Sequence, residues 1–209
     1  MAPVLFFESI SIPLPRNNIY RRLGFVRGIT DIPTSQKEEI ERYIEDASSL
    51  IHLKGAGLRM PITEIQEARI ILPDGLEFES RQLARLLANC SEIVLMGATA
   101  GREIMDAIES DATGANMTRG IVLDAAASEI VDASLNWIMD YFNQSLRREN
   151  RKLLGKRYSA GYGDLFLETQ KAMYRLLQLD RIGIEITDSS MLVPEKSVTA
   201  ITGIKAQTS

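Results

Sequence analysis

Hydrophobic residues recur along this chain with helical spacing in some segments and in short strand-like runs in others. The clearest helical repeat covers residues 34–53, where Ser35 and Glu38 also have the spacing of an N-terminal capping box. The longest repeat runs from Ala126 to about Asn150, and its apolar stripe consists of Val131, Leu135, Ile138, Phe142 and Leu146. Shorter helices are predicted within residues 15–25, 80–90, 92–110 and 166–180. Ser80 is placed to cap the helix of residues 80–90.

Strand-like runs alternate with these helices. They cover residues 3–12, the two halves of 68–80, the start of 92–110, and two pieces of 181–204 on either side of a turn region that contains Pro194. Pro73-Asp74-Gly75 predicts the turn within 68–80, because proline fixes φ and glycine tolerates positive φ. The elements follow no regular βαβ order, and no repeat or linker interrupts them. The pattern therefore favours an α+β fold in a single domain over residues 1–209.

The composition limits the chemistry that the chain can perform. With 209 residues and 45% hydrophobic content, it can bury a full core without disulfides. Cys90 is the only cysteine and is expected to be an inert, buried thiol, whereas His52, the only histidine, is expected in the core or at a helix end. A Cys/His metal site or a Ser-His-Asp triad lacks the necessary residues, so no metal site is predicted. Carboxylates, arginine, tyrosine or a bound cofactor must supply any chemistry.

The net charge and the N-terminal segment limit the partners and the cellular location that the sequence predicts. The formal net charge is −4 and the sequence pI is about 5.2, which argues against a nucleic-acid-binding protein because such proteins need a basic face. Residues 1–16 contain an apolar run, but they lack a basic leader and include Glu8 and three prolines. Neither a signal peptide nor a membrane span is predicted, and a soluble cytoplasmic protein is expected.

Three segments combine polar or small residues in ways that suit a ligand. "GATAG" at residues 97–101 joins a strand to a helix, and a tight connection is favoured there over an anion cradle. The polar face of the long helix carries Asp132, Asn136, Asp140, Asn143 and Arg147, and its periodicity alone predicts a solvated surface. "RYSAGYGDLFLETQK" at 157–171 places an arginine and two tyrosines around a small-residue turn before a helix. This last segment is the most distinctive.

Residues 156–204 resemble the activation (reactivation) domain of cobalamin-dependent methionine synthase, in a freestanding form. They share its Arg-x-x-x-Gly-Tyr turn, the following helix, and a stretch that here consists of Thr187, Asp188, Ser189, Met191, Pro194, Ser197 and Val198. The resemblance extends to the helix around Asp132, which gives a ligand-site region of 126–204. It implies a largely antiparallel sheet with packed helices, a bound S-adenosylmethionine, and a cobalamin carried by a partner protein.

The resemblance also implies roles for individual residues. Arg157 would bind the carboxylate of the methionine moiety through its planar fork of donors. The small residues Ser159, Ala160 and Gly161 would let the backbone approach the ligand. Tyr162 would face the ligand and the corrin as the catalytic residue, and Asp132 would face the ammonium or sulfonium charge. The residues alone leave other readings open: Arg157 in a surface ion pair, Tyr162 in the core, Gly161 and Gly163 as turn formers, and Asp132 on a solvated face.

Three functions follow from these observations. The favoured one is a reactivation subunit for a corrinoid methyltransferase, or for a methionine synthase without its own activation domain, with electrons from a flavodoxin-like or ferredoxin-like donor. The second is a docking module on the same fold that does not bind the methyl donor. The third, an unrelated methyltransferase, is disfavoured because the first strand is not followed by a glycine-rich loop. The resemblance does not place an N-terminal ligand carboxylate, for which Glu8 and Asp31 are candidates by residue type.

Overall fold

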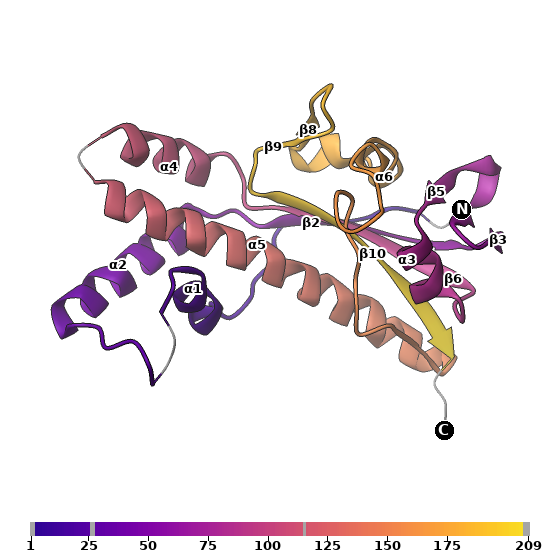
Figure 1. Cartoon of the computed structure of the whole chain (residues 1–209), viewed down its shortest axis with the longest axis horizontal. Helices are drawn as coiled ribbons and strands as arrows, with labels where there is room; N and C mark the ends of the chain where they lie inside the picture. The colour runs from indigo at the N-terminus through magenta and orange to yellow at the C-terminus, as the bar shows by residue number, and fades with distance from the viewer. Residues whose placement is uncertain (1–2, 26–27, 115, 207–209) are drawn as a thin grey trace.

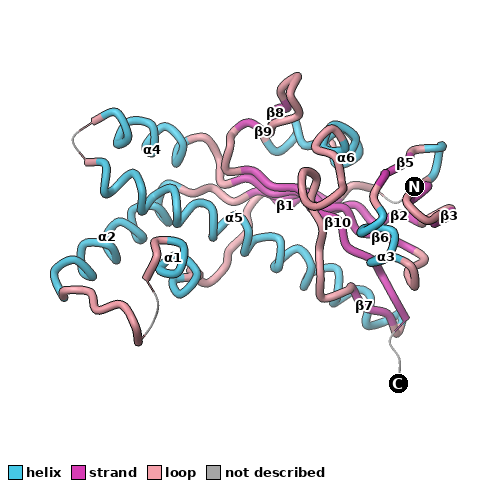
Figure 2. The backbone as a smooth tube through the Cα atoms, viewed as in Figure 1, coloured by secondary structure: helices cyan, strands magenta, loops and turns pink. Residues whose placement is uncertain are grey.

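A five-stranded antiparallel sheet forms the centre of the molecule, in a computed structural model that describes residues 3–25, 28–114 and 116–206. The strands run together through the middle of Figures 1 and 2. Their order across the sheet is β1 (Leu5–Phe7), β2 (Lys54–Pro61), β6 (Glu92–Thr99), β10 (Ser197–Ala206) and β7 (Arg151–Leu153). The prediction of an α+β fold with a largely antiparallel sheet is confirmed.

Each face of the sheet packs against its own hydrophobic core. Along β6, Val94 and Met96 face one core and Ile93 and Leu95 face the other, as the two-residue period of a strand requires. The first core contains α1 (Arg16–Arg22), α2 (Thr34–Leu50), α4 (Glu103–Thr113) and α5 (Met117–Leu146). The second contains α3 (Arg81–Leu87), α6 (Thr169–Leu177), the 3-10 helix Leu179–Ile182 and the small sheet β3 (Glu64–Ile65), β4 (Arg69–Ile71) and β5 (Glu77–Glu79). Helix α5 crosses the sheet diagonally in Figure 1.

Strand β2 was not predicted, because glycines interrupt its hydrophobic pattern. Leu58 and Met60 face the second core, whereas Gly57 faces α5. A Cβ atom on Gly57 would lie 2.5 Å from the Phe142 ring, so only glycine lets α5 pack this closely on the strand. The long helix therefore rests directly on the backbone at the centre of the sheet.

Helix α5 begins at Met117 rather than at the predicted Ala126. Its N-cap is Asn116, whose side chain accepts a hydrogen bond from the backbone N–H of Arg119 at 3.1 Å. Gly120 obscures this first part in the sequence because glycine is a weak helix former. In the fold, Gly120 faces α4, where an added Cβ would lie 3.1 Å from the Cβ of Asp111. Packing between the helices thus extends α5 beyond its intrinsic propensity.

One predicted helix cap is wrong and one is confirmed. The capping box of Ser35 and Glu38 does not form, because α2 begins at Thr34, with Pro33 as its N-cap and no side-chain cap, so Ser35 already lies inside the helix. Ser80 does cap α3, and its hydroxyl accepts a hydrogen bond from the N–H of Leu83 at 2.9 Å. The residue type therefore located the start of α3 correctly, whereas the capping-box spacing did not locate the start of α2.

The segments after α5 also differ in part from the prediction. The chain that follows α5 forms strand β7, Arg151–Leu153, and the N–H of Leu153 donates to Oδ1 of Asn143 at 2.9 Å. Helix α6 ends at Leu177, short of the predicted residue 180, because Gln178 adopts a left-handed φ of 50°. The hairpin of β8 (Glu185–Ile186) and β9 (Leu192–Val193) then leads into β10, close to the predicted strand pieces. Among the described residues, none of the helices combines the length and apolar character needed to cross a membrane.

Candidate functional site

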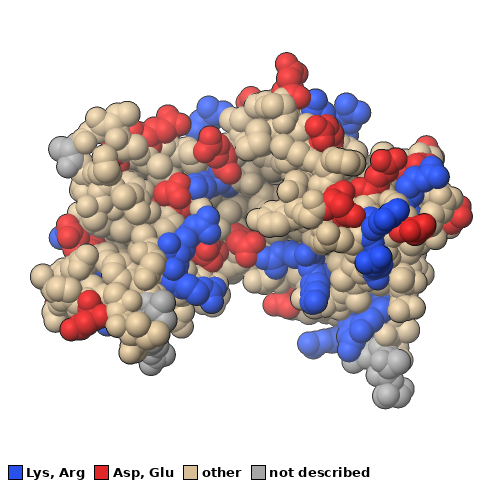
Figure 3. Space-filling model, in the orientation of Figure 1, with Lys and Arg blue, Asp and Glu red and all other residues tan. Residues whose placement is uncertain are grey.

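The fold brings most of the predicted ligand residues into one groove of about 450 Å³. The groove lies between α5, the loop after β7, α6 and the start of β10. It is lined by Asp132, Arg157, Tyr158, Ser159, Ala160, Tyr162, Gln170, Leu192, Ser197, Val198 and Thr199. Figure 3 shows a hollow near the middle of this face, where Figure 1 places α5 beside that loop. Of the predicted ligand residues only Gly161 does not line the groove, although it shapes the turn beside it.

The 157–164 loop is attached to the sheet on one side. Tyr158 forms an isolated antiparallel bridge with Ile201 of β10, with both backbone hydrogen bonds at 2.8 Å. Gly161 has a φ of +84°, which favours glycine, and its N–H donates to the carbonyl of Leu165 at 2.9 Å. The small residues therefore make a tight turn that is held at both ends.

The same loop is attached to α3 on its other side. Asp164 accepts hydrogen bonds from the Ser80 hydroxyl and from the backbone N–H of Arg81, the latter at 2.8 Å. These bonds, the one from Ser80 above all, lower the pKa of the Asp164 carboxyl below its usual range. Gly163 has a φ of +56°, and an added Cβ there would overlap the hydroxyl of Tyr158. The role of Asp164 has no local signal, because its partners lie more than 80 residues earlier in the chain.

An ion pair occupies one end of the groove. Nη2 of Arg157 lies 2.6 Å from Oδ2 of Asp132, and Nη1 donates to Oδ1 of Asn136 at 2.5 Å. The Arg157 side chain is 22% exposed and that of Asp132 is 56% exposed, so solvent reaches the pair from the Asp132 side. The predicted polar face of α5 is therefore not simply solvated here. Arg157 does form an ion pair, which is the alternative that the sequence left open.

Tyr162 stands at the rim of the groove with 70% of its surface exposed, so the alternative of a core residue is wrong. Its backbone is held by two hydrogen bonds: its N–H donates to the carbonyl of Ser159 at 3.2 Å, and its carbonyl accepts from the N–H of Leu165 at 3.1 Å. Phe166 and Met191 are also large, exposed hydrophobic residues. An exposed tyrosine beside a groove is available to a ligand or a partner surface.

The groove contains a polar pair that the sequence analysis missed. Thr199 donates from its hydroxyl to Oε1 of Gln170 at 2.9 Å, and Nε2 of Gln170 donates to the carbonyl of Ser190 at 3.3 Å. Gln170 is only 9% exposed although it lines the groove. The stretch that ends in Ser197 and Val198 was recognised as a motif, but nothing in it identified Gln170 as its partner. The two segments meet only through packing of α6 against the sheet.

Other residues considered in the sequence lie outside the groove. Glu8 lies 3.2 Å from Nζ of Lys54 and does not line the groove, nor does the exposed Asp31. At "GATAG", the N–H of His52 donates to the carbonyl of Ala100 at 2.9 Å, in the tight strand-to-helix connection that was favoured. Among the residues that the structure describes, no group of three or more His, Cys, Asp or Glu side chains is arranged to hold a metal ion.

The single histidine and the single cysteine sit in different environments. His52 lies just after the end of α2, so the predicted position at a helix end is correct and the predicted position in the core is not. Its exposed Nε2 lies 2.9 Å from Oε2 of Glu103. Cys90 is half-buried rather than fully buried, behind Gly203 of β10. Burial raises the pKa of its thiol, which disfavours the reactive thiolate.

This chain is similar to a known protein in structure but matches none in sequence. No protein-family model and no curated protein sequence matches this chain. A crystal structure of the MetH reactivation domain bound to S-adenosylhomocysteine (AdoHcy) superimposes with a TM-score of 0.69 over 96% of this chain and 78% of that one. This chain has the fold of the MetH reactivation domain. The two sequences are 13% identical, so the likeness is one of fold.

Proposed function

We propose that this chain binds S-adenosylmethionine in the groove and presents its methyl group to a cobalamin carried by a corrinoid partner protein. The observation that carries the proposal is an arginine fork and a carboxylate paired in a groove, on the fold of a domain that has been crystallised with AdoHcy. AdoHcy is what remains of S-adenosylmethionine after the methyl group has left. The resemblance of residues 156–204 to the same domain supports the proposal independently.

The pair of Arg157 and Asp132 suits the amino-acid end of S-adenosylmethionine. That end carries a carboxylate and an ammonium group, so it can insert between the two side chains and replace one ion pair with two. Arg157 binds the ligand carboxylate, for which its guanidinium has five N–H donors, and Asp132 faces the ammonium or the sulfonium. The exposure of Asp132 gives the ligand a path to the pair.

The turn positions the rest of the ligand. Ser159, Ala160 and Gly161 carry small side chains, so backbone groups of the turn can approach the ligand closely. Tyr162 at the rim lies between the donor and the partner's corrin, where its ring packs and its hydroxyl meets a polar group. The protein holds and orients the donor, and the two cofactors supply the reactive chemistry.

The transfer requires a partner and an electron. A flavodoxin-like or ferredoxin-like protein would supply one electron to the inactive cob(II)alamin, and the partner's reduced cobalamin would then accept the methyl group. The sulfonium sulfur would keep both electrons of its carbon–sulfur bond, so that AdoHcy would be left in the groove. On this proposal the chain alone should methylate nothing at a useful rate, because the partner supplies the cobalt and another protein supplies the electron.

Two measurements test this function. Isothermal titration with S-adenosylmethionine should show weak to moderate binding, because a shallow groove desolvates only part of the ligand. In a mixture of a corrinoid protein held as cob(II)alamin, a reductant and S-adenosylmethionine, adding this chain should speed the return of the methylcobalamin spectrum. Recovery at the same rate without the chain would refute the reactivation role.

A second candidate function is a docking module that lacks the methyl donor. It is favoured by the internal bonds of Arg157, whose two terminal nitrogens already contact Asp132 and Asn136. Such a module would bind a corrinoid protein in a pull-down but give no heat with S-adenosylmethionine. The titration therefore distinguishes the two functions directly.

A further inference from the structure

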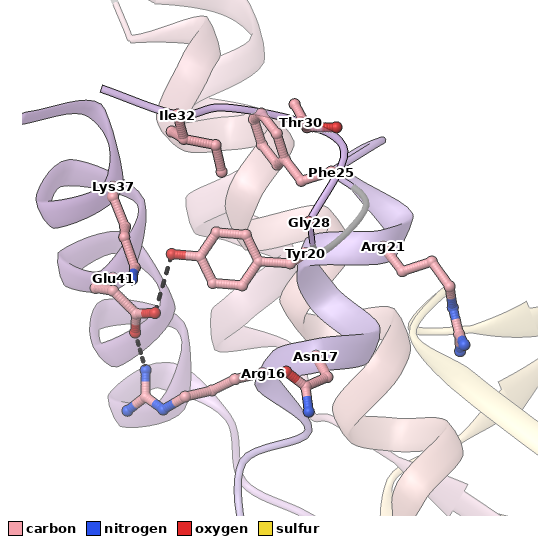
Figure 4. Close-up of a pocket in the computed structure, with 10 residues that line it drawn as sticks. All are labelled: Arg16, Asn17, Tyr20, Arg21, Phe25, Gly28, Thr30, Ile32, Lys37 and Glu41. Carbon is pink, nitrogen blue, oxygen red and sulfur yellow. Dashed lines mark hydrogen bonds and ion pairs between the residues drawn. The ribbon is translucent and has the colours of Figure 1, made fainter. Parts of the chain in front are cut away.

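A second cavity of about 740 Å³ lies between α1 and α2 and shares no lining residue with the groove. Figure 4 shows its walls, which are formed by Arg16, Asn17, Tyr20, Arg21, Phe25, Gly28, Thr30, Ile32, Lys37 and Glu41. Its volume falls within the range of small-molecule sites, about 300–1,000 Å³. Neither the fold nor the proposed methyl transfer accounts for it.

One wall of the cavity is apolar. Figure 4 shows the Tyr20 ring reaching from α1 toward α2, with Phe25 and Ile32 lying above it. The rings of Tyr20 and Phe25 pack edge to face with centroids 6.0 Å apart. This wall offers a flat or branched apolar group a surface of two aromatic rings and one aliphatic side chain.

The opposite wall is polar, and its carboxylate is already satisfied. Oε1 of Glu41 accepts a hydrogen bond from the Tyr20 hydroxyl at 2.9 Å, and Oε2 pairs with Arg16, which also pairs with Glu45. Burial, reinforced by the bond to Glu41, raises the pKa of Tyr20 to about 12. Tyr20 therefore remains a neutral donor bonded to Glu41. Both carboxylate oxygens of Glu41 already have partners, so Glu41 is a poor binding group for a ligand cation.

Lys37 lines the same cavity but takes no part in this network of hydrogen bonds and ion pairs. It lines the cavity one helical turn before Glu41, yet within the described part of the chain its Nζ has no hydrogen-bond or ion-pair partner. Figure 4 shows it on the wall formed by α2, whereas Arg21 points away from the cavity. Lys37 is exposed, so its ammonium can meet an anion at the mouth of the cavity while an apolar body lies against the apolar wall.

We propose that this cavity binds a small amphipathic anion, in which a carboxylate or sulfonate is joined to an aromatic or branched apolar body. The anionic group contacts Lys37, and the body packs on Tyr20, Phe25 and Ile32. The site is independent of the groove. The proposal for this cavity would therefore hold even if S-adenosylmethionine did not bind to this protein.

Two fluorescent probes test the proposal on the whole chain. 8-Anilinonaphthalene-1-sulfonate carries the anion, and N-phenyl-1-naphthylamine is the same aromatic body without it. Lys37→Gln should lower the affinity for the sulfonate by at least about fivefold, equivalent to roughly 1 kcal/mol, and leave the neutral probe within about twofold. Phe25→Ala should weaken both probes, since it removes part of the shared apolar wall. Ile32→Ala serves the same purpose if the Phe25 variant does not fold.

Lys152→Gln is the matched control, because Lys152 is an exposed lysine on the edge strand β7 and does not line the cavity. It should leave both affinities unchanged, and saturating S-adenosylmethionine should not displace either probe. Three results would each overturn the proposal: no sulfonate binding by the wild type, an equal response to Lys37→Gln and Lys152→Gln, or displacement of the probe by S-adenosylmethionine.

Discussion

The groove and the α1–α2 cavity differ in how their charged side chains are paired. In the groove, Arg157 and Asp132 pair with each other across an open surface, so a ligand with both charges can exchange one pair for two. In the cavity, Glu41 is bonded to Tyr20 and Arg16, whereas Lys37 has no ion-pair partner among the described residues and Arg21 points away. An exposed pair of opposite charges suits a zwitterion, whereas a single unpaired cation suits an anion.

The two sites also differ in how the chain builds them. The described residues that line the cavity fall between 16 and 41. Those that line the groove fall between 132 and 199, on α5, the loop after β7, α6, β9 and β10. The groove depends on a loop that is tied to both β10 and α3. Substitutions in that loop should therefore damage the groove and spare the cavity, and this separation can be tested directly.

The largest effect is expected from Gly163→Val. An added Cβ overlaps the Tyr158 hydroxyl, and a branched residue is strained at a φ of +56°, so the loop must move. We expect S-adenosylmethionine affinity to fall by about 100-fold or more, equivalent to about 3 kcal/mol. Sulfonate-probe binding in the cavity should be unchanged. Gly155→Ala is the control, since a Cβ there meets nothing within 4 Å.

Arg157→Ala should weaken S-adenosylmethionine by about 1.5–3 kcal/mol, or roughly 10- to 150-fold, the range for a hydrogen bond to a charged group. Stability should change by less than about 1 kcal/mol, because the ion pair that is lost is open to solvent. Titration calorimetry and thermal unfolding measure the two quantities. Arg148→Ala, which removes an exposed arginine after α5, should change neither. A folded Arg157→Ala protein that binds the donor normally would remove this residue from the site.

Tyr162→Ala should slow methylcobalamin recovery by about tenfold, since misplaced groups around the donor raise the barrier to transfer. Because the ring is exposed, we expect the free energy of unfolding to change by less than about 0.5 kcal/mol. Tyr162→Phe keeps the ring and should have a smaller effect. The control is Ile121→Ala, another exposed apolar residue, which lies on α5. Wild-type recovery by the alanine variant would show that the ring has no part in transfer.

The smallest effect concerns the titration of Tyr20. Its pKa is raised from 10.0 to about 12, so its neutral form is the one that the fold stabilises. The stabilisation is complete below about pH 10 and is lost as pH rises toward 12. Tyrosinate absorbance after a rapid pH jump should show a late step that Tyr20→Phe abolishes. Glu41→Gln should move this step to lower pH, and an unmoved step would show that Glu41 does not hold the proton.

Local features of the sequence predicted much of the fold but little of its long-range contacts. The turn at Pro73-Asp74-Gly75, the cap at Ser80 and the apolar stripe of the long helix were all correct, because each depends on neighbouring residues. Strand β2 was not predicted because its Gly57 is explained only by the Phe142 ring, which leaves no space for a side chain there and is far away in the chain. The start of α5 was missed because packing against α4 overrides the low propensity of Gly120.

For the site, the sequence by itself determined the small-residue turn and the residue types around it, since positive φ at Gly161 and Gly163 is a local requirement. Only the tertiary structure decided that Arg157 pairs with Asp132, 25 residues away. It alone decided that Asp164 anchors the turn on α3, more than 80 residues earlier. Such contacts form because the sheet buries two cores, and burying them brings distant segments together wherever their side chains fit.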